Sequence, residues 1–265
     1  MSWWVLLLLG WGLAATLQLV LYGVQVRTGS ATVVDAGWAA SLVGIAILYA
    51  ALGGGEPVHR VLVAVMATVA FGRLTLHVLR RVPGEEDRRY RELRVRWRAR
   101  GGEQMRFFVL FQAQALIAAL LSLPFLAAVY NRHDGLEALE WIGVAVWLAG
   151  LGCEVQADRQ LERFRRDPSN RGAVIETGLW RYSRHPNYFG QWLTWCGYAL
   201  VGLAAPWGWV GLLSPALMLA LILFVTGVPP LERQMLDSRG EAYRRYQRRT
   251  SMFVPLPPRS TLTPR

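Results

Sequence analysis

The sequence alternates between long apolar runs and dense blocks of arginine, and this segregation constrains the fold more than any other feature. Apolar residues make up 53% of the chain and charged residues 18%, but the charges are gathered into three blocks. A soluble domain needs charge over its whole surface, whereas a membrane-spanning chain confines charge to its loops. We therefore predict an integral membrane protein.

Seven apolar runs are long enough to cross a bilayer as helices. A hydrocarbon core of about 30 Å needs roughly 20 helical residues at about 1.5 Å each. Spanning backbone must satisfy its own hydrogen bonds, and no alternating pattern suggests a β-barrel. We predict an all-α, polytopic bundle of about seven transmembrane helices. The expected spans are residues 3–24, 34–52, 58–79, 106–130, 139–157, 188–205 and 207–228.

Arginine supplies every basic charge, and its distribution predicts the orientation. Nine arginines lie in the loop 80–105, seven in the loop 158–187 and eight after residue 230, whereas the loops expected on the other side carry only Arg60 and Arg132. With seven spans the three blocks share one side, and the positive-inside rule places them and the C-terminus in the cytoplasm. Because the arginines border apolar runs, anionic lipid headgroups explain the net charge of +11 better than nucleic acid does.

Cysteine and histidine carry no recognisable metal or disulfide pattern. Cys153 and Cys196 both lie in apolar runs without a neighbouring cysteine, and the four histidines lack ligand spacing. We expect neither a disulfide framework nor a metal site.

Residues 178–191, with the sequence GLWRYSRHPNYFGQ, form the motif with the most chemistry. They gather hydrogen-bonding side chains at the entrance to the expected sixth span. Arg181 and Arg184 suit phosphate groups, and Asn187 opens a helix whose first N–H groups favour an anion. The alternative is a juxtamembrane anchor built from aromatic residues and arginines.

Upstream of this motif, a charged helical face begins at the end of the expected fifth span. Glu154, Asp158, Glu162 and Arg165 follow one another at spacings of four, four and three residues, which places them on one face. Acidic groups at a membrane boundary need partners or water. Glu154 and Asp158 suit ribose hydroxyls or an amide, and salt bridges with neighbouring arginines are the alternative.

Charged residues also occur inside the early spans. Arg73 and His77 lie one helical turn apart in the third span, and Asp35 begins the second span on the same side. Because intramembrane charges are functional or paired, we predict an Asp35–Arg73 ion pair or a joint substrate contact.

The segment 84–100 is predicted to form a short, highly charged helix. Leu93 and Trp97 would rest on the membrane interface while the arginines meet lipid phosphates. A solvated loop helix is the alternative.

Taken together, these motifs resemble the steroid 5-alpha reductase-like membrane family, in its bacterial branch of uncharacterised proteins with a 3-oxo-5-alpha-steroid 4-dehydrogenase C-terminal-like domain. The resemblance covers most of the chain and is specific for the superfamily, but weak for the substrate. The matching pieces are residues 35–38, 84–90, 154–161, 178–191, 227–232 and 243–255.

The resemblance implies a seven-helix bundle with a cytoplasmic NADPH pocket and a bacterial inner-membrane location. Position 191 is Gln here, where the family usually has an acidic residue. The implied cofactor-binding residues are Glu154, Asp158, Arg165, Arg181, Arg184, His185, Asn187 and Gln191, with Arg244 or Arg249 covering the phosphates.

The implied reaction reduces a carbon–carbon double bond conjugated to a carbonyl in a lipid-like substrate. Hydride goes to the β-carbon, and the charge that builds on the carbonyl oxygen needs a donor. Tyr188 or water then protonates the α-carbon. Asp35 lies where the family is expected to place a residue that binds the substrate. Within a single membrane domain, residues 1–130 would face the substrate, 131–255 would hold the cofactor and 256–265 would form an irregular tail.

Two other classes compete with a reductase. Membrane methyltransferases of the isoprenylcysteine carboxyl and phospholipid types, which use S-adenosylmethionine, share the Arg-His-Pro-x-Tyr-x-Gly core, here residues 184–190. The segments 35–38 and 158–161 match the reductases better. A non-enzymatic protein that binds or transports lipid is the third class. In each case the expected partners are membrane lipids and a lipid-like small molecule.

Overall fold

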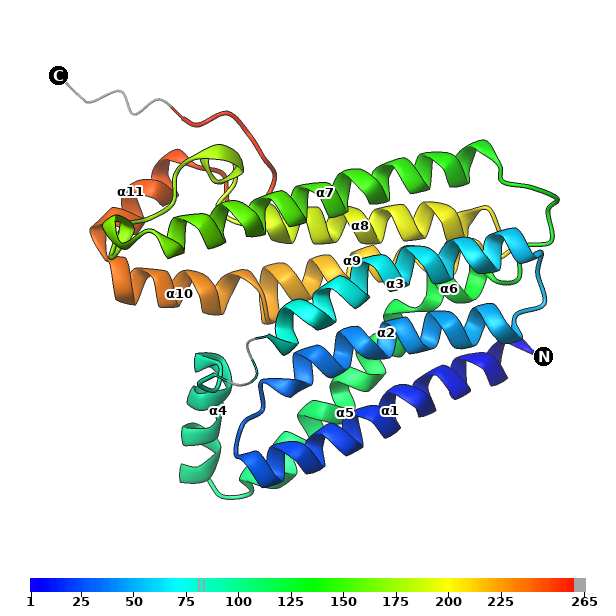
Figure 1. Ribbon diagram of the computed structural model, residues 1–265, viewed down its shortest axis with the longest axis horizontal. Helices are drawn as coiled ribbons and strands as arrows, with labels where there is room; N and C mark the ends of the chain where they lie inside the picture. Colours follow the sequence, from blue (N-terminus) through cyan, green and yellow to red (C-terminus); the bar gives the residue numbers. More distant parts are fainter. Residues whose placement is uncertain (81, 83, 260–265) are drawn as a thin grey trace. The chain divides into compact units, whose positions relative to one another are not determined.

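The computed structural model describes residues 1–80, 82 and 84–259 of the chain (Figure 1). The expectations for Arg81, Arg265 and the end of the tail lie outside these residues. No β-strand occurs in the described part, so the all-α prediction is confirmed. The helices are α1 Trp3–Thr28, α2 Val33–Leu52, α3 Pro57–Leu79, α4 Arg88–Ala99, α5 Glu103–Leu121, α6 Leu123–Ala128, α7 Ala138–Arg166, α8 Pro186–Leu203, α9 Leu213–Ala220, α10 Val228–Arg239 and α11 Glu241–Arg249.

Six helical stretches of the described chain are long and apolar enough to cross a membrane, which confirms a polytopic membrane protein. These stretches are Trp3–Thr28, Val33–Leu52, Pro57–Leu79, Glu103–Ala128, Ala138–Arg166 and Gly208–Arg239. The remaining expected span corresponds to α8, whose 18 residues begin with the polar end of the motif. The count of seven therefore stays a prediction.

The chain forms two compact units, which are described separately below. The first unit comprises Met1–Trp141 and Tyr198–Ser214, and the second comprises Ile142–Gly197 and Pro215–Arg265.

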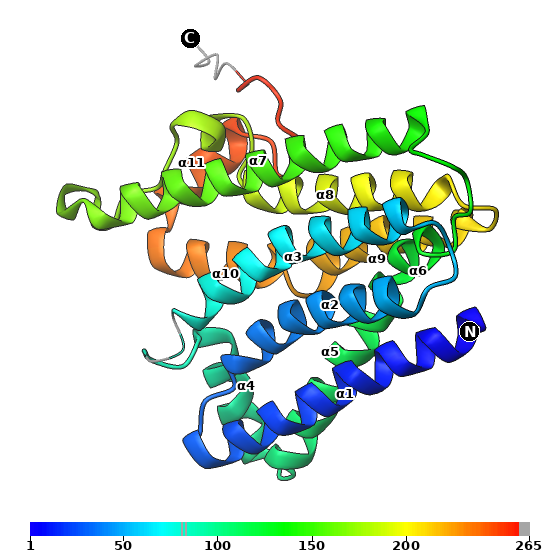
Figure 2. The same cartoon turned by 45° about the vertical axis from the view of Figure 1, so that its right-hand side comes forward.

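The first unit is a helical bundle in which α1, α2 and α5 run side by side (Figures 1 and 2). Leu42, Ile45 and Tyr49 of α2 are fully buried in its core. A Cβ atom at Gly10 would lie 2.6 Å from the Tyr49 hydroxyl, so α1 needs glycine to pass this ring. The same hydroxyl reaches the hydroxyl of Ser122 at 3.2 Å.

The expected fourth span is one apolar stretch that breaks at Ser122 into α5 and α6. Pro124 occupies the first turn of α6, where a missing backbone N–H costs least. The Ser122 hydroxyl donates to the carbonyl of Ala119 at 2.7 Å, which satisfies a carbonyl at the end of α5.

The charged helix predicted between residues 84 and 100 is confirmed as α4, but its apolar side faces protein. Asp87 caps it by accepting from the backbone N–H of Arg89. Trp97 packs edge-on against Phe107 with ring centroids 4.9 Å apart, and Leu93 joins the same cluster. Leu93 and Trp97 are partly buried in this cluster, and the contact of α4 with the membrane interface stays a prediction.

The second unit is built on the close approach of α7 and α8, which lie side by side (Figures 1 and 2). A Cβ at Gly150 would lie 2.5 Å from Thr194 N, and one at Gly190 would lie 2.5 Å from Glu154 N. Small residues let membrane helices pack backbone to backbone. The contact brings the acidic face of α7 beside the first turns of α8.

The last hydrophobic stretch runs further than expected. A π-helical turn over Leu221–Val225 is closed by a bond from Thr226 N to Leu221 O at 2.8 Å, and α10 then continues to Arg239. Such single π turns often occur at functional sites. Here the turn precedes the helix that carries Glu232.

Candidate functional site

The α7–α8 contact joins Asp158 and Asn187, two residues that the family resemblance implicates in cofactor binding. Asn187 Nδ2 donates to Asp158 Oδ1 at 3.2 Å, and Asn187 Oδ1 accepts from Tyr188 N at 3.0 Å. Gln191, one turn further along α8, makes no side-chain hydrogen bond to any described residue. Its amide is therefore free to bind a ligand.

The motif loop that precedes α8 is held on α7. Gly178 adopts a φ of +59°, in the left-handed region that favours glycine, and a Cβ there would press on the Gln160 side chain. Leu179 N donates to Gln160 Oε1 at 2.9 Å, and Trp180 Nε1 donates to Ala157 O at 3.1 Å. These bonds explain the placement of the loop without any ligand.

Glu232 of α10 is the centre of a partly buried polar cluster. Its Oε1 accepts from Arg184 Nε at 2.7 Å, lies 3.2 Å from His185 Nε2 and accepts from the Tyr243 hydroxyl at 3.2 Å. Its Oε2 accepts from Gln247 Nε2 at 2.8 Å. No role was assigned to Glu232 from the sequence, although it lies in the matching segment 227–232, because its partners are 11 to 48 residues away along the chain.

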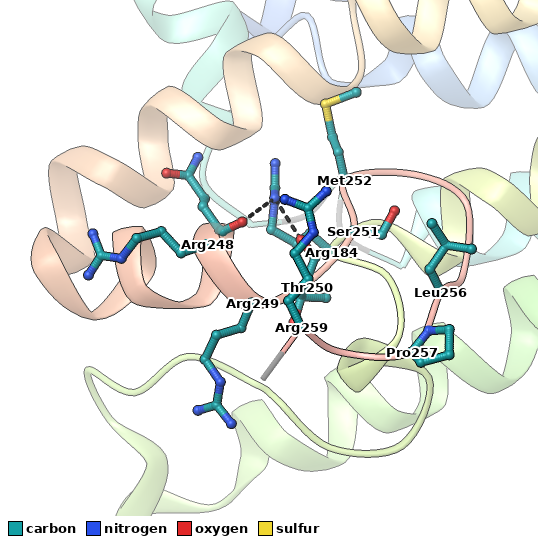
Figure 3. Close-up of a pocket in the computed structure, with 10 residues that line it drawn as sticks. Arg184, Arg248, Arg249, Thr250, Ser251, Met252, Leu256, Pro257 and Arg259 are labelled. Atoms are coloured by element: carbon teal, nitrogen blue, oxygen red, sulfur yellow. Dashed lines mark hydrogen bonds between the residues drawn. The ribbon is translucent and has the colours of Figure 1, made fainter. Parts of the chain in front are cut away.

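Arg184 also closes the C-terminal end of α11. Its Nη1 donates to the carbonyls of Gln247 at 3.1 Å and Thr250 at 2.9 Å (Figure 3). A cation at this end satisfies carbonyls that lack a helical partner. Arg184 is thus committed to the protein's own groups at both its Nε and Nη1 atoms.

Two buried tyrosines complete this cluster. The Tyr246 hydroxyl donates to the carbonyl of Trp180 and lies 3.3 Å from that of Ser183. Burial raises the pKa of Tyr243 and of Tyr246 well above the usual value near 10. Both phenols therefore act as neutral hydrogen-bond donors.

A pocket of about 310 Å³ lies beside the Glu232 cluster. One part of its wall is apolar, with Leu161, Phe164, Ile175 and Met235. The polar part comprises Arg165, Arg171, Arg184, His185, Arg239, Tyr243 and Tyr246.

Two nitrogen atoms of the residues lining this basic pocket lack a partner within the described chain. His185 is 1% exposed and its Nδ1 makes no hydrogen bond; the same holds for the buried Nε of Arg239. An unsatisfied buried polar atom costs about 1–3 kcal/mol, so each favours a ligand or water that supplies the missing bond.

The structure brings together only some of the residues proposed from the sequence. Arg165, Arg184 and His185 line the basic pocket. A second set lies on α7 and α8, where Asn187 bonds Asp158, and comprises Glu154, Asp158, Asn187, Tyr188 and Gln191. Three further candidates lie outside the pocket lining, namely Arg181, Arg244 and Arg249.

Asp35 has different partners from those expected. Its Oδ2 accepts from Arg89 Nη2 at 3.0 Å and its Oδ1 accepts from the Tyr90 hydroxyl at 2.6 Å. The predicted pair with Arg73 is thus replaced by two contacts to α4. A catalytic role for Asp35 stays a prediction, and its contacts fix α4 on α2.

These features define a polytopic helical membrane protein with a basic and aromatic pocket at the end of its second unit. The family model described as "Protein of unknown function (DUF1295)" matches residues 21–250, and the chain belongs to that family. An uncharacterised protein of Schizosaccharomyces pombe is 25% identical over 272 residues, which cover 89% of this chain and 76% of that protein.

Named relatives match a shorter region. Human 3-oxo-5-alpha-steroid 4-dehydrogenase 1 is 31% identical over 83 residues, or 29% of this chain and 32% of the enzyme. Steroid 5-alpha-reductase DET2 of Arabidopsis thaliana is 36% identical over 92 residues, or 32% of this chain and 33% of the enzyme. The resemblance to steroid 5-alpha reductases is thereby confirmed for about a third of their length. No solved structure matches the chain.

Proposed function

We propose that the chain is an NADPH-dependent membrane reductase that reduces a carbon–carbon double bond conjugated to a carbonyl in a lipid-like substrate, steroid or isoprenoid. The similarity to steroid 5-alpha reductases supports the reaction class. The observation that carries the proposal for this chain is the basic pocket, with its unpartnered buried nitrogen atoms beside an apolar wall.

The pocket suits the adenosine end of a phosphorylated dinucleotide. Its volume of about 310 Å³ is at the lower end of the range for small-molecule sites, which fits one half of a dinucleotide. Leu161 and Ile175 offer an apolar surface to a base. Arg171 and Arg239 offer guanidinium groups to a phosphate, which they bind in charge-assisted pairs.

The facing surfaces of α7 and α8 suit the other end of the cofactor. The Asn187 amide, positioned by Asp158, and the unpaired Gln191 amide both donate and accept, as a carboxamide requires. Gln191 does this without the charge of the family's acidic residue. Bound NADPH would supply the hydride.

Tyr188 is the proposed proton donor to the substrate. Its ring lies parallel to that of His185, with centroids 5.6 Å apart and an interplanar angle of 15°. His185 is fixed in turn by Glu232. A phenol held in this way delivers a proton from one position, which is what general acid catalysis needs.

The arginine distribution supports a cytoplasmic location for this unit, in the inner membrane of a bacterial cell, with membrane lipids and a lipid-like substrate as its partners. The cytoplasm is also where a reductase would meet NADPH.

Cofactor titration tests the proposal. Purified full-length protein in a non-ionic detergent is titrated calorimetrically with NADPH, NADH and S-adenosylmethionine. We expect NADPH to bind more tightly than NADH, and Arg239→Gln to reduce that difference by a factor of about ten or more, since one charge-assisted contact contributes roughly 1.5–3 kcal/mol.

Arg233→Gln is the matched control, because Arg233 is an exposed arginine of α10 outside the pocket lining. Equal loss in both variants would remove the specific role of Arg239. Binding of S-adenosylmethionine without NADPH would reject the reductase and favour the methyltransferase.

A further inference from the structure

The C-terminal strap, residues 250–259, encloses a second hollow in the second unit. The strap leaves the end of α11 and returns to it, because Arg259 N donates to Arg249 O at 2.9 Å. Arg184 N donates to Ser251 O at 2.8 Å, which ties the strap to the motif loop. The hollow within this turn has a volume of about 290 Å³ (Figure 3).

The lining of this strap hollow is strongly basic and contains no acidic residue. Its four arginines are Arg184, Arg248, Arg249 and Arg259. The first is paired as described above, and Arg248 pairs with Glu241 at 2.7 Å. The guanidinium groups of Arg249 and Arg259 form no ion pair or hydrogen bond with any described residue. Two positive charges therefore remain uncompensated at one hollow.

The strap also presents apolar side chains next to these charges. Met252, Val254 and Leu256 are 39%, 48% and 53% exposed, although large apolar groups are usually buried. Figure 3 shows Arg248 on one side of the hollow and Leu256 and Pro257 on the other. An occupant that combines an anionic group with an apolar body matches both sides.

We propose that the strap hollow binds the phosphate group of an anionic phospholipid, with the acyl chains against the exposed apolar side chains of the strap. Guanidinium groups suit phosphate oxygens through parallel N–H donors, and the Ser251 side chain at the lining adds a hydroxyl. This site differs from the basic pocket proposed for the cofactor, with which it shares only Arg184. It goes beyond the reductase function and does not depend on it.

Lipid retention by the purified protein tests this site. Delipidated full-length protein in a non-ionic detergent is titrated with phosphatidylglycerol, phosphatidylcholine or inorganic phosphate. Bound lipid is counted by native mass spectrometry, and thermal midpoints report phosphate binding. The variant Arg249→Gln/Arg259→Gln is compared with Arg245→Gln, an exposed arginine of α11 outside the hollow.

We expect the wild type to retain phosphatidylglycerol in preference to phosphatidylcholine. The double variant should need about 25-fold more phosphatidylglycerol for the same occupancy, because each of the two arginines near an anionic headgroup strengthens binding roughly fivefold. Arg245→Gln should bind like the wild type. Added salt should weaken the wild-type interaction, since the site is exposed.

Three results would overturn the proposal. Unchanged phosphatidylglycerol occupancy in the double variant would show that the two arginines do not bind lipid. An equal loss in Arg245→Gln would indicate a diffuse charge effect rather than a site. A midpoint raised by inorganic phosphate through Arg249 and Arg259, with no preference for phosphatidylglycerol, would assign the hollow to free phosphate. NADPH titration of Arg259→Gln alone separates this site from the cofactor site, because Arg259 neither lines the basic pocket nor is expected to bind the cofactor, so its NADPH affinity should equal that of the wild type.

Discussion

His59 Nδ1 lies 2.6 Å from Glu140 Oε1 in the first unit, and both side chains are fully buried. His59 Nε2 lies 2.9 Å from the carbonyl of His133, so this nitrogen carries a proton. A further proton lies between Nδ1 and the carboxyl oxygen, because neither atom bonds the other without one. The other oxygen, Glu140 Oε2, accepts from Glu137 N at 3.0 Å. The pair thus joins α3 to the start of α7.

We predict that Glu140→Gln is tolerated whereas Glu140→Ala is not. A glutamine donates from Nε2 to a neutral His59 and accepts from Glu137 N, so every bond is kept and the cost is about 1 kcal/mol or less. Alanine leaves His59 without its buried partner and costs about 3 kcal/mol. Thermal midpoints in one detergent measure both. Equal midpoints for the two variants would contradict this account.

The buried tyrosines predict a loss of stability at alkaline pH. Because burial raises the pKa of Tyr246 in the folded protein, the folded state holds the proton more tightly than the unfolded state does. Tyr246 contributes its full stabilisation below about pH 10, where its phenol is neutral in both the folded and the unfolded protein. This stabilisation is lost as the pH rises from there towards the folded-state pKa.

The Tyr246→Phe variant tests this pH dependence. It should start with a lower midpoint at pH 8, since it lacks the bond to the Trp180 carbonyl, but lose less between pH 9 and 11. Tyr182→Phe, at an exposed position, is the control and should keep the wild-type slope. A Tyr246→Phe slope as steep as the wild type would argue against a raised pKa at this position.

The arginine blocks predict a cytoplasmic C-terminus, and a fused reporter measures it. Alkaline phosphatase attached after the last residue should be inactive, and a fluorescent protein that matures only in the cytoplasm should be bright. The physical reason is that arginine-rich loops resist translocation. Activity of the phosphatase fusion with a dark fluorescent fusion would invert the orientation and place the basic pocket outside the cell.

Local sequence patterns anticipated the parts of the fold that depend on neighbouring residues. The spacing of Glu154 and Asp158 predicted a shared helical face, and α7 continues without interruption to Arg166. The position of Asn187 after a proline predicted a helix start, and α8 begins at Pro186. Periodicity and proline chemistry act over one or two turns, so they are visible in the sequence.

Contacts over long sequence separations were missed. Nothing near Glu232 indicates that Arg184, 48 residues earlier, would bind it. Similarly, Asp35 accepts hydrogen bonds from Arg89 and Tyr90, which are 54 and 55 residues away along the chain. The helix positions alone had favoured Arg73 as its partner. From the sequence, several arginines are equally suitable partners for these two carboxylates, and only the tertiary packing determines which of them forms the bond.

Asn187 gives the sharpest test of the cofactor placement. Its side chain donates to Asp158 and accepts from Tyr188 N, which leaves one N–H and one acceptor position for the nicotinamide carboxamide. We predict that Asn187→Ala weakens NADPH binding by about 1–3 kcal/mol, as expected for one or two hydrogen bonds in a partly buried site. NADPH affinity by calorimetry and the thermal midpoint are measured on the same preparation. The control is Asn131→Ala in the first unit, because the Asn131 side chain also accepts from a backbone N–H, that of His133 at 3.0 Å, and lies outside the basic pocket.

If Asn187 only stabilises the start of α8, alanine would lower the midpoint and cost about 1 kcal/mol of stability with no change in affinity. That result would show that the nicotinamide carboxamide does not bind at this part of α8. A loss of affinity with an unchanged midpoint would support the placement. The variant Asn187→Asp distinguishes the two readings further. It removes the N–H that donates to Asp158 at 3.2 Å and puts a second carboxylate there, which repels the first. NADPH binding by this variant should recover as the pH falls and the carboxylates share a proton, whereas an asparagine that acts only on the helix start predicts no such recovery.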